Sequence, residues 1–412
     1  MGDEEGRAAI EAAAPLRLVE DVKIKATPFV WRAPSEIPRR RHLYGFELSR
    51  GHLSAVVAPG AAGKTTFKVG RALCMATGRE HLGHRVWQGP HRVWLWNLED
   101  DMEEVERLIH AFCKLWDIGP ADFDGRLFVD SALDGAILKL AVEGQGGGYE
   151  IKRPTVVALI DELKARGIDY LDVDPFVSSH AVNENDNGAI DAVSKEWAQV
   201  AHEANAAICL AHHIRKPNGA DATVNDARGA SALVNTCRSV LTINRMTEDQ
   251  AVLFTIPPCD ARRYIRVFDD KNNRAPPPPT NSEWYEITGV DLGNGDEDGP
   301  PDNVGAVRRW QAPDAFGGVT KAEMIAIQKA VEKADKDVVN GRVRKNPQAT
   351  RWVGNLVIQI LGLNRDSPAD LARVKEMCRV WLANGFLRSE PGKTAKGDPT
   401  DFVLVGNVVE AE

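Results

Sequence analysis

The chain has 412 residues, of which 43% are hydrophobic and 27% are charged, and its formal net charge is −8. This length exceeds one ordinary domain, so we expect a main domain with smaller additions. The negative charge argues against attraction of the whole surface to nucleic acid. No apolar run approaches membrane-spanning length and the N-terminus is acidic, so we expect a cytoplasmic protein without a signal peptide or a membrane partner.

The cysteines do not follow the spacing of a metal site or of a cross-linked fold. No Cys-x-x-Cys pair occurs, which indicates neither a zinc site nor a disulfide framework. We expect these residues to be reduced and buried. They are Cys74, Cys113, Cys209, Cys237, Cys259 and Cys378.

In chain order, the first segment is irregular and the second has a regular alternation. Residues 1–42 are interrupted by four prolines, and we interpret them as an N-terminal arm. Within residues 43–290, short apolar runs alternate with helical periods, which predicts an α/β domain with a mostly parallel sheet covered on both faces. The expected strands are 54–58, 93–97, 127–129, 170–173, 207–211, 240–243 and 252–256.

The most informative stretch reads Ala-Pro-Gly-Ala-Ala-Gly-Lys-Thr-Thr and lies between the first expected strand and an expected helix over 67–77. Such a loop cradles the phosphates of a nucleoside triphosphate, with Lys64 reaching the β- and γ-phosphates and the Thr65 hydroxyl ligating Mg²⁺. The consensus begins with Gly where this chain has Ala58, which a strand end with negative φ accommodates. The residues assigned to ATP are Pro59, Gly60, Ala61, Ala62, Gly63, Lys64, Thr65 and Thr66.

Acidic residues follow two of the expected strands. At the end of strand 170–173, we choose Asp174 as the carboxylate that holds Mg²⁺ through water, because Asp172 would point to the same side but deeper. A turn acid before proline is the alternative. After strand 93–97, Glu99 could accept a proton from the water that attacks the γ-phosphate. Asp100 or Asp101 is more simply explained as a helix N-cap, and capping by the whole acidic cluster is the alternative.

Basic residues follow the strand over 207–211. His212 and His213 have no third ligand at metal-binding spacing, so we favour a hydrogen bond from one of them to phosphate or to the attacking water, and the spacing does not decide which. Arg228 lies in the next loop among small residues. An arginine in such a position can stabilise charge on the transferred phosphoryl group, often across a subunit boundary. Surface solvation is the alternative.

The C-terminal quarter differs in pattern. We expect an edge strand at 283–287, a linker at 291–315 and a winged-helix-like α+β domain at 316–412, because three helical periods precede two short strands around a basic turn. From residue 303 onward the chain carries 17 Lys and Arg against 13 Asp and Glu. This mildly basic tail could bind DNA or contact a protein, and chance fluctuation is the alternative. The expected helices cover 321–334, 352–361 and 368–384, and the strands 385–388 and 402–405.

Taken in order, five motifs resemble those of the RepA-type hexameric replicative helicases and their broader family of ATPases with a RecA-like core, over roughly residues 43–256. The resemblance implies a RecA-like P-loop NTPase fold and a ring of six subunits, with ATP between neighbours and single-stranded DNA in the channel. By position it assigns Lys64 and Thr65 to phosphate and Mg²⁺, Glu99 to catalysis, Asp174 to the metal, His213 to γ-phosphate sensing and Arg228 to the arginine finger of the adjacent subunit. The motifs are Ala-Pro-Gly-Ala-Ala-Gly-Lys-Thr, Leu-Glu-Asp-Asp, Asp-Pro-Phe followed by Asn-Glu-Asn-Asp, His-His-Ile-Arg-Lys and Ala-Arg-Gly-Ala-Ser.

These observations lead to two main hypotheses of function. The first is a DNA-dependent ATPase of plasmid or mobile-element type, acting as a helicase or translocase, whose C-terminal domain recruits DNA or a replication partner. The second is an ATP-switched regulatory protein that binds DNA through its winged helix. A recombinase-like filament is a third, disfavoured because no N-terminal polymerisation motif is evident.

Overall fold

The computed structural model describes nine ranges of the chain: 25–144, 147–214, 221–226, 231–254, 256–275, 282–311, 319–337, 341–394 and 397–408. The chain divides into two compact units, residues 1–40 and 41–412. The described part of the first unit includes the short turn η1 (Pro34–Glu36). In the nine ranges, no helix has the length and apolar character needed to span a bilayer.

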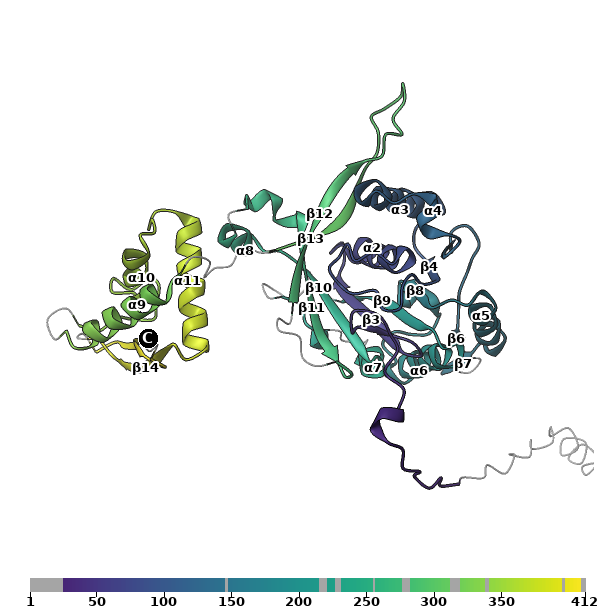
Figure 1. Ribbon diagram of the computed structural model, residues 1–412, viewed down its shortest axis with the longest axis horizontal. Coiled ribbons are helices and arrows are strands. Elements are labelled where there is room, and N and C mark those ends of the chain that lie inside the picture. Colours follow the sequence, from purple (N-terminus) through teal and green to yellow (C-terminus); the bar gives the residue numbers. More distant parts are fainter. Residues whose placement is uncertain are drawn as a thin grey trace, which may run out of the picture. The chain divides into compact units, whose positions relative to one another are not determined.

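The second unit contains, among the described residues, a sheet with the strand order β13-β12-β11-β10-β3-β9-β8-β4-β5 (Figure 1). The strands from β10 to β5 in that order pair in parallel, and β11, β12 and β13 extend the sheet with antiparallel pairs. This arrangement confirms the predicted α/β class with a mostly parallel sheet. The strands are β3 (Leu53–Pro59), β4 (Val93–Asn97), β5 (Leu127–Ser131), β8 (Tyr170–Asp174), β9 (Ala207–Ile214), β10 (Ser239–Arg245), β11 (Tyr264–Asn272), β12 (Ser282–Asp291) and β13 (Asn303–Trp310).

Helices cover both faces of this sheet. Side chains alternate across a strand, so Ala55 and Val57 of β3 pack in one core, while Val56 and Ala58 pack in the other. Figure 1 shows α2 and α3 on one face and α5 and α6 on the opposite face. The helices are α2 (Lys64–Thr77), α3 (Met102–Trp116), α4 (Pro120–Phe123), α5 (Arg153–Arg166), α6 (Asn187–Ala204), α7 (Ser231–Thr236) and α8 (Glu248–Leu253).

Short elements connect the main ones. Two small antiparallel pairs, β1 with β2 and β6 with β7, lie outside the large sheet. They and the remaining turns are β1 (His42–Tyr44), β2 (Leu48–Ser49), β6 (Ala141–Glu143), β7 (Tyr149–Ile151), η2 (Phe176–Ser179), η3 (Val224–Asp226) and η4 (Pro258–Arg263). Four cysteines are buried as expected, but Cys113 is partly exposed and Cys259 is exposed, so the prediction of burial is wrong for these two.

Two of the expected strands differ from the structure. The expected strand at 252–256 overlaps helix α8, because Thr247 forms a capping box: its hydroxyl accepts from Gln250 N at 3.2 Å, and Gln250 Oε1 accepts from Thr247 N at 2.9 Å. The expected edge strand at 283–287 belongs to β12, which lies between β11 and β13 and is therefore an interior strand.

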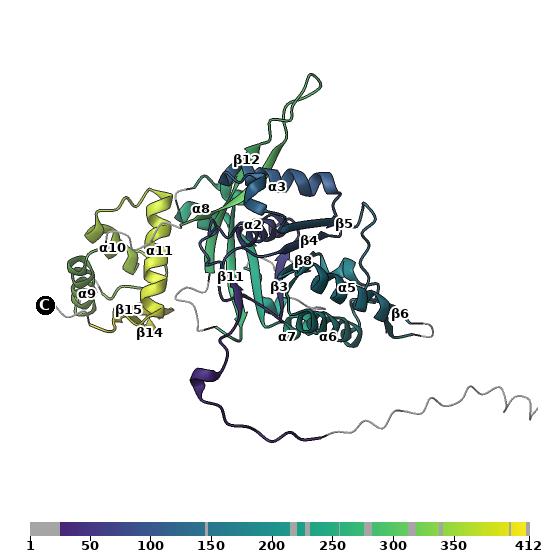
Figure 2. The same cartoon turned by 45° about the vertical axis from the view of Figure 1, so that its right-hand side comes forward.

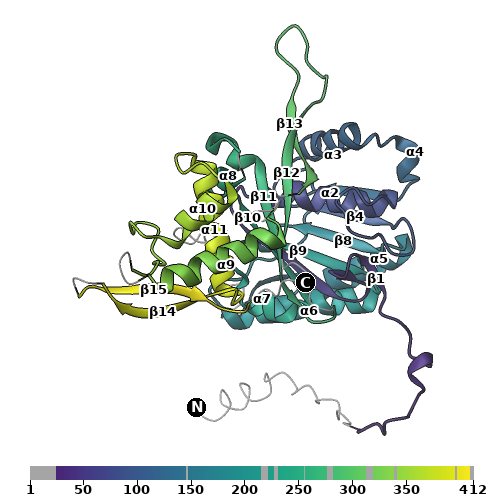
Figure 3. The same cartoon turned by 60° about the vertical axis from the view of Figure 1, so that its left-hand side comes forward.

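The expected linker at 291–315 also begins too early. β12 and β13 form a long hairpin (Figure 3), and β13 occupies residues inside that expected linker. Asn294 and Asp302 close the Gly-, Asp- and Pro-rich loop: Asn294 Nδ2 donates to Asp302 Oδ2 at 2.8 Å, and Asp302 N donates to Asn294 Oδ1 at 2.9 Å. The composition typical of a linker here forms a hairpin loop, so the sheet continues to Trp310.

The C-terminal part has its own core, in which Trp352, Val374 and Trp381 pack together. Its described residues form three helices and a two-stranded hairpin, close to the positions expected from the sequence, and Figure 2 shows how they are arranged. Arg344 makes an isolated bridge to Phe402, which ties the segment before the second helix to the hairpin. The winged-helix assignment remains a prediction. The elements are α9 (Lys321–Asp335), α10 (Val353–Leu361), α11 (Pro368–Ala383), β14 (Leu387–Lys393) and β15 (Pro399–Val405).

Candidate nucleotide-binding site

The phosphate loop joins the end of β3 to the start of α2. Gly63, the residue before α2, has a φ of 88°, and a Cβ there would lie 2.9 Å from Ile287 Cδ1, so both the backbone and the packing favour glycine. No side chain caps α2, which leaves the first N–H groups of the helix open to an anion. Ala58 pairs with His213 inside the sheet, so the departure from the consensus glycine is accommodated by regular strand structure.

Three side chains from two elements converge at this loop. Thr65 Oγ1 donates to Asp174 Oδ2 at 2.9 Å, and Lys64 Nζ lies 3.2 Å from Asp174 Oδ1. Burial alone would raise the pKa of Asp174, but the ammonium groups of Lys68 and Lys64 lower it below its ordinary value. The carboxylate is therefore ionised and lies at the carboxyl end of β8, beside the start of α2.

These residues fit a magnesium ion. Asp174 Oδ1 is buried and its partner among the described residues is the ammonium of Lys64, so this oxygen becomes available to a ligand when Lys64 turns to the phosphates. A hydroxyl and a carboxylate are the hard oxygen ligands that Mg²⁺ takes, directly or through water. Thr65 and Asp174 would hold the ion, which would neutralise charge on the phosphate oxygens. Because α2 and β8 fix these two oxygens, no rearrangement of the backbone is needed to present them.

The two histidines of β9 lie in different surroundings. His213 is exposed, and Lys64 Nζ donates to its Nε2 at 3.2 Å. Burial, and then the positive charge of Lys64, lower the pKa of His213, so the ring is neutral at neutral pH. His212 lies against Phe176, with ring centroids 6.2 Å apart, and burial lowers its pKa to about 4. Between the two, His213 is therefore the one beside the phosphate loop.

The acidic run after β4 is organised by Asn97, which no sequence pattern singled out. Asn97 Oδ1 accepts from the backbone N–H groups of Glu99 and Asp100, both at 2.8 Å, and its Nδ2 donates to Asp100 Oδ2 at 2.9 Å. Asp101 caps α3 by accepting from Glu104 N at 2.8 Å. The Glu99 side chain takes part neither in the hydrogen bonds of Asn97 nor in the cap of α3, and it is exposed at the end of β4. Burial lowers the pKa of Lys64, and the negative charges of Asp174 and, to a smaller extent, Glu99 oppose this lowering, so Glu99 is close enough to Lys64 to act on its charge.

A second group of charges lies beneath the site and was not expected. Lys68 Nζ lies 2.7 Å from Asp172 Oδ1 and donates to Val173 O at 3.0 Å, and the side chain is 1% exposed. Burial would lower the pKa of Lys68, but Asp172 and Asp174 raise it. Asp172 is thus deeper than Asp174, and its partner is a lysine one turn after Lys64. The signal in the sequence was a pair of cations, Lys68 and Arg71, among the apolar residues of α2.

Arg71 continues this buried group by another turn. Its Nη2 donates to Tyr170 Oη and to Cys209 Sγ, both at 3.0 Å, and its Nη1 lies 3.3 Å from Glu47 Oε1. Tyr170 in turn donates to Asp172. Lys68, Arg71, Asp172 and Tyr170 form what we call the buried ionic group, which joins α2 to β8 below the phosphate loop.

Strand β10 adds one further contact to the site, and one assigned residue lies outside the described part of the chain. Arg245 at the end of β10 donates to the carbonyl oxygen of Ala61 and so holds the phosphate loop from the side. Arg228, assigned as a finger, lies outside the described residues. The structure thus brings Lys64, Thr65 and Asp174 together, places His213 beside Lys64, and gives no position for the arginine.

Comparison with known proteins finds one family and several solved structures. Residues 19–219 match the family described as AAA domain. No curated protein matches the sequence. Among solved structures, the RadB recombinase is 15% identical with a TM-score of 0.38, covering 58% of this chain and 89% of that one. A structure described as an ATPase domain is 13% identical with a TM-score of 0.40, covering 58% and 82%. A DnaB-like replicative helicase, solved with its interactions with primase, is 14% identical with a TM-score of 0.41, covering 59% and 56%.

The family match and the geometry of the phosphate loop bear on the same segment. The matched residues contain β3, the loop, α2, β4, β8 and β9, which are the elements that carry Lys64, Thr65, Glu99, Asp174 and His213. Together they support an ATPase of the P-loop type in this segment.

Proposed function

We propose that this chain is an ATP-hydrolysing DNA helicase or translocase of the RepA type. It acts on single-stranded DNA as a homo-hexameric ring in the cytoplasm, in plasmid or mobile-element replication. The observation that carries the proposal is the convergence at one loop of Lys64, Thr65 and Asp174, with His213 3.2 Å from the lysine. The order of motifs along the chain supports the RepA type.

The chemistry is in-line attack of water on the γ-phosphate, accelerated mainly by positioning and electrostatics. Lys64 contacts the β- and γ-phosphates and offsets their charge. Glu99, exposed at the end of β4, accepts the proton of the attacking water. His213 donates to or accepts from the γ-phosphate region and so reports whether that phosphate is present. Lys64 must exchange Asp174 and His213 for phosphate oxygens when ATP binds.

In this proposal ATP lies between neighbouring subunits and Arg228 acts on the ATP of the adjacent one. Subunits carrying Arg228→Ala, mixed with subunits carrying Glu99→Gln, should then recover part of the ATPase rate, because some interfaces contain a working base and a working arginine. Each variant alone is the control. No recovery at any mixing ratio would count against a shared site.

A second candidate is an ATP-switched regulatory protein that binds DNA. The hairpin and helices of the C-terminal part favour it, since α11 carries exposed cations beside β14–β15. In that case ATP controls assembly and hydrolysis is slow. Sequence-specific binding without strand displacement would distinguish it from a motor.

The deciding experiment is the steady-state ATPase rate with and without single-stranded DNA, at fixed salt because DNA affinity depends on ionic strength. Lys64→Ala is the blank, and duplex DNA of the same sequence is the control for strand state. Strong stimulation by single strands is expected. A slow rate that single strands leave unchanged would overturn the motor and favour the regulator.

A further inference from the structure

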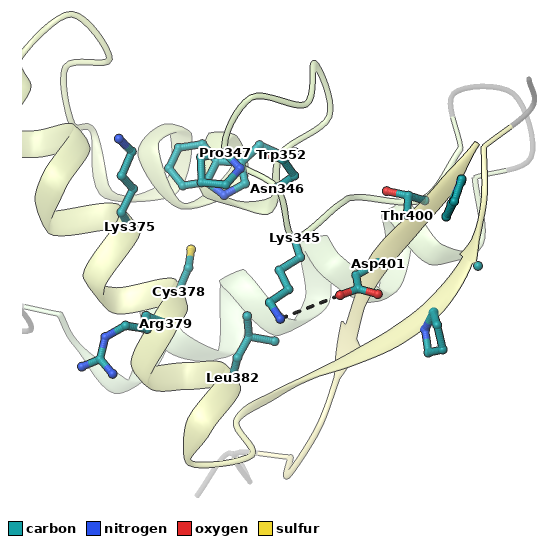
Figure 4. Close-up of a pocket in the computed structure, with 13 residues that line it drawn as sticks. Lys345, Asn346, Pro347, Trp352, Lys375, Cys378, Arg379, Leu382, Thr400 and Asp401 are labelled. Atoms are coloured by element: carbon teal, nitrogen blue, oxygen red, sulfur yellow. Dashed lines mark ion pairs between the residues drawn. The ribbon is translucent and has the colours of Figure 1, made fainter. Parts of the chain in front are cut away.

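A groove of about 670 Å³ lies in the C-terminal part, between α11, the hairpin β14–β15 and residues 345–352 (Figure 4). Three of its lining side chains are cations, Lys345, Lys375 and Arg379, and one is an acid, Asp401. Figure 4 shows Lys375 and Arg379 on α11 and Lys345 nearer the hairpin, with the Lys345 ammonium directed toward Asp401. The lining is therefore positive overall and built from separate elements.

The cations of this groove are free to change partners. In the ranges that the structure describes, Lys375 is exposed and has no acidic partner. Lys345 Nζ is 3.8 Å from Asp401 Oδ2, and both side chains are about half exposed. Arg379 pairs with Glu376 at 2.6 Å but is 68% exposed. Exposed ion pairs of this kind contribute little free energy, so a phosphate can replace either carboxylate.

The surroundings of the groove argue against a protein partner. Protein interfaces have an apolar core with large side chains that a partner covers. In the described portion of 319–408, Val408 is the only large hydrophobic side chain that is exposed, and it does not line the groove. The cations are therefore not arranged around an apolar anchor, as they would be for a docking peptide.

The groove also lacks what unpaired bases need. Single-strand binding uses aromatic faces on which bases stack. Trp352 is the one aromatic side chain in the described lining, and at 2% exposure it offers no such face. The major groove of B-DNA, about 12 Å wide, admits an α-helix between two walls of phosphate. Helix α11, with cations one turn apart and a hairpin beside it, has the form that such a groove accepts.

We propose that this groove binds the phosphate backbone of double-stranded DNA, with Lys375, Arg379 and Lys345 each contacting a phosphate. The inference differs from the motor in the part of the chain and the form of DNA involved, and it deepens the second candidate function by naming the residues and the kind of DNA contacted. It does not require that the core hydrolyse ATP or act on single strands. The duplex contact would hold this part of the chain on double-stranded DNA while the core acts elsewhere.

The test is binding of the full-length protein to a labelled random duplex of about 20 base pairs, without nucleotide, from about 50 to 200 mM salt. Lys375→Ala/Arg379→Ala is the groove variant. Lys329→Ala/Lys333→Ala removes the same charge from exposed positions of α9 that do not line the groove. Fluorescence anisotropy gives the affinity and its salt dependence for each protein.

Two lost phosphate contacts should reduce the slope of log K against log salt by about 2 and weaken binding about tenfold or more at low salt. The α9 variant should match the wild type within about twofold with an unchanged slope. Equal curves for the groove and α9 variants, or a wild type that does not bind duplex, would overturn the proposal. The second of these outcomes would favour an acidic protein partner.

Separate readouts distinguish this inference from the motor. Thermal unfolding and the ATPase rate with single strands should be the same for the groove variant and the wild type, because both substituted side chains are exposed. If duplex binding depends on the groove but single strands do not change the ATPase rate, the motor is refuted and the duplex site is supported. If single strands stimulate hydrolysis but duplex binding does not depend on Lys375 and Arg379, the motor is supported and the duplex site is refuted.

Discussion

The positive side chains of α2 lie in two regions, one at the phosphate loop and one a turn or more deeper. At the loop, Lys64 lies between Asp174 and His213, and both of these partners can be replaced by phosphate oxygens. In the deeper region, Lys68 and Arg71 contact residues of β8 and β9 that stay in place in the sheet. Both regions are buried, so burial does not distinguish a ligand-binding charge from a structural one. The difference is whether the partner can be exchanged.

The comparison is tested most strongly at the phosphate loop. Lys64→Ala should lower the ATPase rate by about a thousandfold or more, because the charge on the β- and γ-phosphates loses its counter-ion. The free energy of unfolding should change by only about 1 kcal/mol or less, since Asp174 keeps Thr65 and Lys68 as partners. Urea unfolding and steady-state hydrolysis measure the two effects. If Lys64→Ala lowers the free energy of unfolding as much as a Lys68 substitution does, the two regions do not differ in the way proposed.

Substitution in the buried ionic group should have the opposite profile. Lys68→Met leaves Asp172 buried without its cation, so the free energy of unfolding should fall by about 3 to 5 kcal/mol. The double variant Lys68→Met/Asp172→Asn removes the charge of both partners and should recover much of this loss in urea unfolding. If the double variant is as unstable as the single one, the lysine contributes through packing and not through its charge.

A substitution of Glu99 tests whether an acidic residue near the phosphate loop acts in catalysis and not in folding. Glu99→Gln should slow hydrolysis by about a hundredfold while ATP affinity is retained, because the amide cannot take the proton of water. Asp101→Asn is the matched control, since asparagine caps a helix as well as aspartate does and α3 should be unaffected. Single-turnover hydrolysis and equilibrium ATP binding separate the two quantities. Equal turnover by the Gln variant would remove Glu99 from the mechanism.

The smallest expected effect is a dependence of ATP binding on pH. Burial and Lys64 lower the pKa of His213 in the free protein, and the negative charge of bound ATP should raise it. A group with a higher pKa in the complex takes up a proton on binding, so affinity should increase a few-fold from about pH 8 to pH 6. Binding is measured in the Glu99→Gln background to prevent turnover.

Two further variants isolate His213 in that titration. His213→Gln should remove its share of the pH dependence and leave the protons of ATP itself. His212→Gln should not, because burial lowers the pKa of His212 to about 4 and the ring stays neutral throughout this range. An unchanged pH dependence in His213→Gln would show that the exposed histidine does not meet the phosphates.

The sequence was informative where function and fold depend on neighbouring residues. Strand β4 has the bounds 93–97 expected from its apolar run, and the phosphate loop is contiguous, so both could be identified directly. Strand β11 was missed, because charged side chains such as Arg266 and Lys271 interrupt its apolar pattern. The segment 252–256, expected as a strand, overlaps helix α8, which begins at a capping box formed by Thr247.

Contacts between distant residues could not be predicted in the same way. Lys68 and Asp172 are more than a hundred positions apart, and their pairing depends on how α2 lies against β8. The choice between His212 and His213 likewise required the strand register, which pairs Ala58 with His213. In both cases the residue types were visible in the chain, but the geometry that assigns them a role was not.

The contact between Gly63 and Ile287 has a practical consequence for fragment design. Ile287 is in β12, which is completed by β13, and Val307 of β13 lies where a Cβ on Gly70 of α2 would come within 3.2 Å of it. The antiparallel strands β12 and β13 therefore pack against the phosphate loop and against α2. A fragment ending near residue 290, where the linker was expected to begin, would lack β13 and expose the side of β12 that pairs with it. A fragment extending through Trp310 retains both strands. The smallest soluble ATPase fragment should therefore end after Trp310.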